Sequence, residues 1–306
     1  MDVVRQVLPS VVLIRTPDGL GSGVVLDRSG NIVTNAHVAG SATKFGVQVA
    51  GDTAPRTAQL IGTYPPDDLA VIRADDPSGL QPATFGDSDR VQAGDVVLAI
   101  GNPLGLSGSV TEGIISATDR AVTEPATAGP AGQSAAAATL PGAIQTSAPI
   151  NPGNSGGALV STSGQVIGIP TLAAASPQGG AQAQGIGFAI PSNLARDIAT
   201  QIIDSGHVTN SHRAALGAEV ATVLSADGAS ARGVGVVTIT GGGPADRAGL
   251  RTGDVIKSVG SASTPDTTAL SAALAGARPG DKVRLTISRG AQDQTVQVTL
   301  GELPGG

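Results

Sequence analysis

The chain has 306 residues, enough for two or three domains, and 40% of them are hydrophobic, so substantial cores can form. The net charge of −6 and the near absence of aromatic residues exclude the basic, aromatic surface of a nucleic-acid-binding protein. The absence of cysteine excludes disulfides and thiolate metal sites, and the scattered histidines without a His-Glu-x-x-His motif predict no metal site.

The N-terminal stretch lacks the charged start and apolar run of an export signal. No apolar run in the chain approaches the roughly 18 residues that a membrane span requires. We therefore expect either a cytoplasmic protein or a sequence from which an export or anchor segment is missing.

Short strands dominate the first quarter of the chain. After an amphipathic stretch that ends at Pro9, turns rich in Gly, Pro, Asp and Asn separate strand-like runs at residues 11–14, 21–26, 32–34, 46–50, 57–62 and 69–74. So many short strands in succession predict a β-barrel.

A second set of strands is predicted near residues 95–100, 110–116, 143–146, 157–160, 164–169 and 185–190. Two low-complexity segments interrupt this set, at 124–141 and 173–184, and their lack of periodicity predicts mobile loops.

Helical spacing begins at Ser192, a candidate N-cap, and continues to Ser205, with Gly206 as the stop signal. Residues 207–213 are polar and typical of a linker. The last ninety or so residues form a separate unit, with a helix near 266–276 and a final strand near 295–300.

The run Gly153–Gly157, with the sequence Gly-Asn-Ser-Gly-Gly, points to chemistry. It places Ser155 in a turn of small residues whose amides can converge on one spot, as an oxyanion hole requires. In a chain this rich in glycine the run could also be a plain turn. Serine needs a positioned base and an acid that orients the base, and the chain contains candidates for both upstream.

His37 is the candidate base and Asp68 the candidate acid. His37 could instead close a strand against a carbonyl, and His207 and His212 are alternative bases, but both fall in the linker. Asp68 adjoins a core strand, so we expect its carboxylate beside the histidine, whereas Asp67 is expected to be a solvated turn residue. Because the order His, Asp, Ser is a known order for a catalytic triad, these residues predict a serine peptidase.

Together these segments resemble the HtrA (Deg) family of trypsin-like serine proteases. The resemblance covers nearly the whole chain and rests on the motifs Pro9–Val12, Gly21–Gly23, Thr34–Val38, Asp68–Val71, Gly101–Leu106, Ile144–Thr146, Ile150–Gly157 and Gly185–Ser192.

The resemblance implies a mainly β fold. Residues 1–208 would form a chymotrypsin/trypsin-like double six-stranded β-barrel with the active site between the barrels, including a helical linker over 192–206. Residues 209–306 would form an α+β PDZ domain. The triad implied by the family is His37, Asp68 and Ser155.

The resemblance also suggests binding sites. The amides of Gly153 and Ser155, joined by that of Asn154, would stabilise the oxyanion. Ile150 and Ile186 would line a pocket for a small or medium aliphatic residue before the scissile bond, unless both belong to the barrel core.

Residues Arg213–Ala218 look like the carboxylate-binding loop of a PDZ domain. In that role Ala215, Leu216, Gly217 and Ala218 would hold the C-terminal end of an extended peptide. The alternative is a packing domain with an occluded groove.

Several positions depart from the trypsin or family pattern. Pro149 replaces the trypsin acid that selects Arg or Lys, and Asn154 replaces the Asp that pairs with a new N-terminus during activation. Pro170 donates no amide in the strand expected to pair with substrate, and Ser147 stands where many relatives have Asp. The short turn 15–20 lacks the loop that builds large cages in some relatives.

The predicted function is an endopeptidase that cleaves unfolded or damaged proteins through an acyl-enzyme, with no cofactor and no ATP. Its partners would be unfolded protein or peptide substrates and a C-terminal peptide in the PDZ groove, with membrane contact only through a segment absent from this sequence. A homotrimer, frequent in the family, is left open because the N-terminal region lacks aromatic residues. Two alternatives are a chaperone or sensor that cleaves little and a PDZ scaffold with a silent protease fold.

Relatives of this family act in bacterial envelopes or in organelles, so an extracytoplasmic protein of the periplasm or cell envelope is expected. The segments 121–142 and 172–185 are expected to control activity, because they are of low complexity and are predicted to lie beside the active site.

Overall fold

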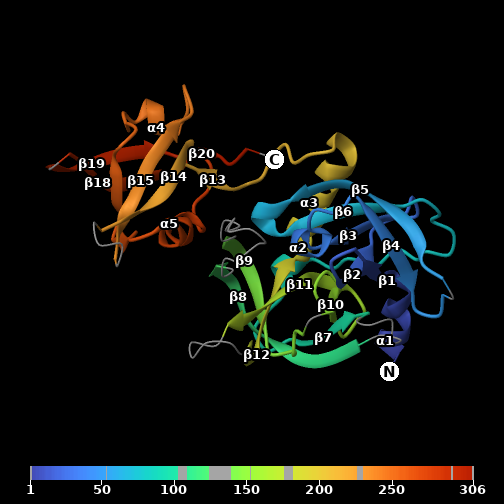
Figure 1. The fold of residues 1–306 in the computed structure, drawn as a ribbon. Helices are drawn as coiled ribbons and strands as arrows, with labels where there is room; N and C mark the ends of the chain where they lie inside the picture. Colours follow the sequence, from blue (N-terminus) through green and yellow to red (C-terminus); the bar gives the residue numbers. More distant parts are fainter. Residues whose placement is uncertain are drawn as a thin grey trace. The chain divides into compact units, whose positions relative to one another are not determined.

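The computed structural model describes residues 2–52, 54–102, 109–123, 139–151, 153–175, 182–225, 230–290 and 292–304. The chain forms two compact units (Figure 1). The first covers residues 1–120 and 142–209, and the second contains residues 210–305. Among the described residues, no helix combines the length and the apolar character needed to cross a membrane.

The first unit starts with helix α1 (Asp2–Val7) and the 3₁₀ turn η1 (Leu8–Ser10) and continues into a closed barrel. The strands follow the order β1-β2-β3-β6-β5-β4 around this barrel. Its members are β1 (Val11–Arg15), β2 (Leu20–Val25), β3 (Asn31–Thr34), β4 (Lys44–Val49), β5 (Arg56–Tyr64) and β6 (Leu69–Ala74). The predicted barrel is thereby confirmed.

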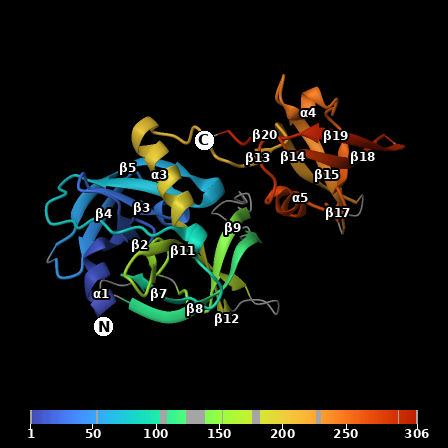
Figure 2. The same cartoon turned by 180° about the vertical axis from the view of Figure 1, so that it is seen from behind.

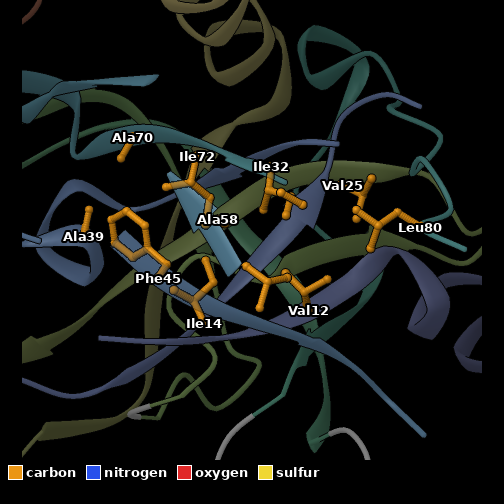
Figure 3. Packing of buried hydrophobic residues seen from close by; sticks show 12 residues of the cluster. Val12, Ile14, Val25, Ile32, Ala39, Phe45, Ala58, Ala70, Ile72 and Leu80 are labelled. Atoms are coloured by element: carbon orange, nitrogen blue, oxygen red, sulfur yellow. The ribbon is translucent and has the colours of Figure 1, made fainter. Parts of the chain in front are cut away.

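Aliphatic side chains fill the first barrel, because the sequence offers few aromatic ones. Figure 3 shows them converging from the surrounding strands, with Phe45 next to Ile14 and Ala39. Ala39 belongs to the short helix α2 (Ala36–Ala39) and is only 1% exposed. Burial of Ala39 therefore fixes α2, which also carries His37, to the barrel.

A second closed barrel follows, with the strand order β10-β11-β12-β9-β8-β7. Its strands are β7 (Val96–Gly101), β8 (Ser109–Thr123), β9 (Thr139–Thr146), β10 (Ala158–Ser161), β11 (Val166–Ala175) and β12 (Gln182–Pro191). The buried side chains Val97, Ile115, Ile144 and Leu159 belong to its core.

The strands of the second barrel run further than the sequence predicted. The ends of the expected loops 124–141 and 173–184 are strand, since Ala175 pairs with Gln182 and β9 begins at Thr139. Backbone pairing needs no apolar alternation, so segments rich in Ala and Gly can extend a ladder without a clear sequence signal. The central parts of both segments lie outside the described residues.

Helix α3 (Ser192–Ser205) packs against β5, β6 and β11 (Figures 1 and 2). Its end at Gly206, which adopts a left-handed conformation, matches the predicted stop. The predicted N-cap is wrong: the cap position is Pro191, and the buried hydroxyl of Ser192 donates to the carbonyl of Gly86 at 2.9 Å. A fully buried hydroxyl must find a partner, and here a distant carbonyl supplies it.

The segment 207–213, predicted as a linker, is tied down at both ends. The amide of Thr209 donates to Gln201 Oε1 at 2.9 Å within the first unit. The amide of Ser211 donates to Glu302 Oε1 at 2.6 Å within the second.

The second unit is built on a six-stranded sheet with the order β14-β15-β16-β18-β19, and β17 pairs with β16. Two helices accompany it, α4 (Pro244–Arg247) and α5 (Thr267–Leu274), the latter capped by the Asp266 side chain. The strands are β13 (Ala214–Ala215), β14 (Ala218–Leu224), β15 (Ala231–Ile239), β16 (Val255–Val259), β17 (Ala262–Ser263), β18 (Lys282–Arg289), β19 (Gln292–Thr299) and β20 (Gly301–Glu302).

Candidate active site

A cavity of about 370 Å³ in the first unit brings the predicted catalytic residues together. His37 from α2 and Ser155 from the turn before β10 both line it. The remaining wall comes from the β1–β2 turn, the end of α2, and the residues Ile150, Asn151, Gly153 and Thr171.

The ring of His37 is held by Asp68 in a two-point contact. The imidazole Nδ1 lies 2.8 Å from Asp68 Oδ2, and the backbone amide of His37 donates to Asp68 Oδ1 at 2.9 Å. An ionised carboxylate only accepts hydrogen bonds, so Nδ1 carries the proton in this contact. Nε2 is then the ring nitrogen that can take up a proton from another group.

Asp68 itself is fixed by its position in the chain. It follows the 3₁₀ turn η2 (Pro65–Asp67) in a left-handed conformation with φ of 51°, which Asp tolerates better than most residues. Its carbonyl accepts from Asn35 Nδ2 at 3.0 Å and from the Ala36 amide at 3.1 Å. The Thr171 hydroxyl donates to Oδ2, so the carboxylate, only 3% exposed, is oriented entirely by the protein.

The expectation that Asp67 is solvated is wrong, because this residue is completely buried. The prediction assumed that adjacent acids alternate between two faces, as they would in a strand. Asp67 instead lies in η2, where successive side chains do not alternate.

The turn around Ser155 is closed by its own backbone. The amide of Asn154 donates to the Asn151 carbonyl at 3.0 Å, and the amide of Gly157 donates to the Asn154 carbonyl at 2.9 Å. The Ser155 hydroxyl donates to the carbonyl of Thr171 at 3.2 Å. Thr171 therefore contacts both the candidate acid and the candidate nucleophile.

Two glycines let neighbouring strands pass directly behind Ser155. A Cβ added to Gly156 would collide with the carbonyl oxygen of Ser22, and one added to Gly157 would collide with that of Ile100. Gly156 also has a φ of 79°, which disfavours any other residue.

The three amides predicted for the oxyanion hole are not equivalent in the structure. Within the described part of the chain, the amides of Gly153 and Ser155 donate to no protein acceptor, whereas the amide of Asn154 donates to the Asn151 carbonyl. The geometry thus leaves the outer two available for a ligand.

The two isoleucines of the predicted specificity pocket occupy different places. Ile150 lines the cavity and is also part of the second barrel's core, where Gly187 leaves room for its side chain. Ile186 is 37% exposed and is not among the residues that line the cavity. The roles of both side chains stay predictions.

The alternative histidines do not belong to the cavity lining. His207 follows α3, and its Nδ1 contacts the carbonyl of Ser205 at 3.0 Å. His212 lies in the second unit. Across the described ranges, no cluster of three or more His, Cys, Asp or Glu side chains could hold a metal ion.

A largely apolar groove runs between β14 and α5 in the second unit. It is lined by the predicted loop residues Ala215 to Ala218 and by Leu270 and Leu274 of α5. The loop is rigid, because the Leu216 carbonyl accepts from the Ala245 amide at 2.8 Å and the Gly217 carbonyl accepts from the Thr240 amide at 3.0 Å.

Sequence reasoning missed two residues that support the site, Thr171 and Ser22. Thr171 follows Pro170, which the sequence singled out, but a single strand hydroxyl carries no signal of its target. Ser22 lies in the motif Gly21–Gly23 without an assigned role, and it contacts the turn around Ser155 from the first barrel.

Comparison with known proteins agrees with these two units. A family model described as a trypsin-like peptidase domain matches residues 21–169, and one described as a PDZ domain matches residues 208–300. Serine protease PepD of Mycobacterium tuberculosis is 40% identical over 98% of this chain and 65% of its own length. Periplasmic pH-dependent serine endoprotease DegQ of Escherichia coli is 39% identical over 92% of this chain and 59% of its own. The chain therefore spans less than two thirds of either relative.

The chain covers a larger share of other relatives. Chloroplastic Protease Do-like 1 of Arabidopsis thaliana is 36% identical over 98% of this chain and 68% of its own length. The solved structure of the HtrA-type protease AlgW with a tripeptide matches with a TM-score of 0.63 and 38% identity, covering 99% of this chain and 97% of that one. A serine endoprotease structure from Yersinia pestis gives a TM-score of 0.61 and 34% identity over 99% and 97% of the two chains. With its paired barrels and PDZ domain, the chain belongs to the HtrA family of trypsin-like serine proteases.

Proposed function

We propose that this protein is a serine endopeptidase that hydrolyses peptide bonds through an acyl-enzyme, without ATP or a cofactor. One observation carries the proposal. His37, fixed by the 2.8 Å contact of its Nδ1 with buried Asp68, shares one cavity with Ser155.

Acylation begins when the Ser155 hydroxyl turns from the Thr171 carbonyl towards His37 Nε2. The oxygen attacks the substrate carbonyl carbon while Nε2 takes the proton, and Asp68 stabilises the imidazolium that results. The negative charge develops on the substrate carbonyl oxygen, where the amides of Gly153 and Ser155 can receive it. Collapse of this intermediate breaks the C–N bond, and Nε2 returns the proton to the leaving amine.

Deacylation repeats these steps with water as the nucleophile. His37 Nε2 takes a proton from water, the hydroxide oxygen adds to the ester carbon, and collapse expels the Ser155 oxygen. The proton then returns from Nε2 to Ser155, and the enzyme is restored with the acid product released.

The substrates we infer are unfolded or damaged proteins with an accessible extended segment. A small or medium aliphatic residue before the scissile bond fits an apolar wall at Ile150, and the absence of an acid at Pro149 removes any selection for Arg or Lys. The names of the endoprotease relatives support peptide-bond hydrolysis in protein substrates.

The PDZ domain is proposed to bind a C-terminal peptide in the groove between β14 and α5. Such domains add an extended peptide as a strand and hold its carboxylate with loop amides. The periplasmic relatives support a location outside the cytoplasm, in the bacterial cell envelope. The proposal also includes a homotrimer, which sedimentation measurements of the molecular mass can test.

Labelling with a phosphonofluoridate tests the catalytic assignment. The peptide that contains Ser155 should gain one organophosphoryl group, and the gain should vanish in Ser155→Ala. Ser163→Ala, in the exposed turn between β10 and β11, serves as the control and should label like the parent. A folded parent that is unlabelled and cleaves no denatured protein would favour the chaperone or scaffold alternatives.

Cleavage-site mapping on a denatured protein tests the substrate proposal. Val, Ala, Ile or Leu should be enriched before the cut, with no enrichment of Arg or Lys. Random cut sites would contradict the pocket at Ile150 without contradicting the assignment of Ser155.

A further inference from the structure

Ser22 of β2 contacts the turn around Ser155 from the opposite barrel. It is completely buried, and its hydroxyl donates to the Gly153 carbonyl at 2.5 Å. Its backbone amide donates to the Ser155 carbonyl at 3.0 Å. One residue of the first barrel therefore holds two carbonyls of the turn that carries the nucleophile.

These contacts fix the planes of successive peptides. The carbonyls of Gly153 and Ser155 are held by Ser22, and the Asn154 carbonyl between them accepts from Gly157. Because a trans peptide is planar, its N–H points opposite to its C=O, so anchoring the Asn154 carbonyl also aims the Ser155 amide. The Asn154–Ser155 peptide carries the Ser155 amide. Ser22 thus holds the peptide before it and the peptide after it.

The direction of the Ser22 hydroxyl is set by a third partner. The amide of Asn102, just after β7, donates to Ser22 Oγ at 2.8 Å, so the hydroxyl proton is directed to the Gly153 carbonyl. Thr34 Oγ1 donates to the Ser22 carbonyl at 2.7 Å and holds the strand in place.

The turn needs such an anchor because Gly153 is conformationally permissive. Its φ is 107°, in the region that favours glycine, and glycine changes its dihedral angles with little steric resistance. The Asn151–Asn154 hydrogen bond restrains the same peptide from the other side, and among the described residues the Ser22 hydroxyl alone ties it to the first barrel.

We propose that Ser22 is a positioning residue that keeps the oxyanion-binding turn in its catalytic shape. The inference rests on the proposed acyl-enzyme function, since it concerns the amides that receive the negative charge. Ser22 touches no reacting atom; it acts through the carbonyl of Gly153.

Ser22→Ala tests the proposal in the full chain. It removes the hydroxyl bond to Gly153 and the acceptor of the Asn102 amide, and it keeps the backbone bond to Ser155. We expect kcat on a peptide substrate to fall about 10- to 100-fold, because the loss is one of orientation rather than of a donor itself. KM should change by less than about twofold, since Ser22 is not in the cavity wall. The pH dependence of kcat/KM should keep its midpoint, because the contacts of His37 and Asp68 are untouched.

Ser192→Ala is the matched control. Ser192 is also completely buried and donates one hydrogen bond to a backbone carbonyl, that of Gly86, away from the cavity. If buried hydroxyls act only through stability, both substitutions should lower the melting temperature. Each variant should then keep the parental kcat at temperatures below its own melting transition. Ser22→Cys nearly preserves the volume and offers a weaker donor, so it should fold and give an intermediate kcat.

The outcomes separate this inference from the proposed function. A parent that cleaves substrate and labels at Ser155, together with a folded Ser22→Ala or Ser22→Cys of parental kcat, overturns the role of Ser22 alone. An equal loss of kcat in Ser192→Ala also overturns it. A parent without turnover or label overturns the proposed function instead.

Discussion

The catalytic cavity and the PDZ groove are built by opposite means. The cavity is assembled from hydrogen bonds that join distant parts of the chain, such as Thr171 to Asp68 and Ser22 to Gly153. The groove is lined by one short loop, the strand that continues from it and the apolar face of α5.

The difference fits the role proposed for each region. Transfer of a proton and stabilisation of a developing charge require donors fixed to within fractions of an ångström, which buried hydrogen bonds can supply. Holding an extended peptide requires an open strand edge and apolar contact, which tolerate small displacements. The cavity should therefore be sensitive to single polar atoms, and the groove to backbone shape.

Asp68→Asn should have the largest effect on the cavity. The amide cannot reproduce the two-point carboxylate contact with His37, and it permits the wrong imidazole tautomer, so we expect kcat to fall by about 10⁴-fold. Steady-state kinetics at neutral pH measures this loss. Asp67→Asn, at the adjacent buried acid, should alter stability more than kcat, and an equal loss of kcat in both variants would contradict the assignment.

The sequence predicts those parts of the molecule that a short motif specifies. Gly153–Gly157 forms the turn that its glycines require, and the strand runs before residue 75 form the first barrel. His37 and Ser155, which line one cavity, could be predicted because each lies in a segment of recognisable composition.

The supporting contacts are hidden from the sequence because they depend on how the barrels meet. Nothing near Thr171 indicates that its hydroxyl reaches Asp68, and nothing near Ser22 indicates the carbonyl of Gly153. The burial of Asp67 was missed for a local reason, since a charged turn residue was expected to face solvent, whereas the turn η2 buries it. Long-range side-chain partners are thus the part that required the structure.

Thr171→Val should produce a smaller loss at the same site. It removes the hydroxyl bond to Asp68 and keeps the carbonyl that contacts Ser155, so we expect kcat to fall about tenfold. Thr171→Ser retains the hydroxyl and should keep most of the parental kcat. Thr146→Val removes a buried threonine hydroxyl that donates to the Ile114 carbonyl, and it should leave kcat unchanged. A Thr171→Val enzyme with parental kcat would show that the Asp68 contact is dispensable.

Gly217→Ala should damage the groove and spare the cavity. Gly217 has a φ of 68°, and an added Cβ would lie 2.7 Å from Pro244 Cδ, so the loop proposed to bind the peptide carboxylate must shift. We expect the Kd for a peptide with a free C-terminus to rise about tenfold, from a strain of about 1–2 kcal/mol. Fluorescence anisotropy measures the Kd, and a short reporter peptide should be cleaved at the parental rate.

Gly260→Ala is the control for a strained glycine substitution outside the groove. Gly260 has a φ of 57° and nothing within 4 Å of an added Cβ, so it shares the strain without the collision. Its substitution should leave peptide affinity unchanged. Equal Kd values for the parent and Gly217→Ala would mean that the carboxylate of the peptide binds outside the loop that contains Gly217.

The smallest expected effect concerns an ion pair that braces the second unit. Asp254 is 1% exposed and accepts from Arg289 Nε and Nη2, each at 2.7 Å, while Arg289 also donates to the Gly249 carbonyl at 2.8 Å. The hydrogen bonds from Arg289 hold the pKa of Asp254 below its ordinary value, and the Arg251 amide adds to the shift. The arrangement ties the turn before β16 to the end of β18.

Asp254→Asn should therefore weaken the PDZ domain in a pH-dependent way. A carboxyl group with a lowered pKa in the folded state contributes stability above its unfolded pKa, near 4, and loses that contribution as the pH falls through the folded value. At pH 7 the amides of β16 and β18 should exchange with solvent about threefold faster in the variant than in the parent, which corresponds to about 0.65 kcal/mol. The difference should shrink as the pH falls below about 4, because the Asp254 carboxyl then takes up a proton in the unfolded parent more readily than in the folded one, where its pKa is lowered. If the difference in exchange rate between parent and variant stays constant down to pH 3, the carboxylate charge contributes nothing to stability, and packing alone keeps this turn in place.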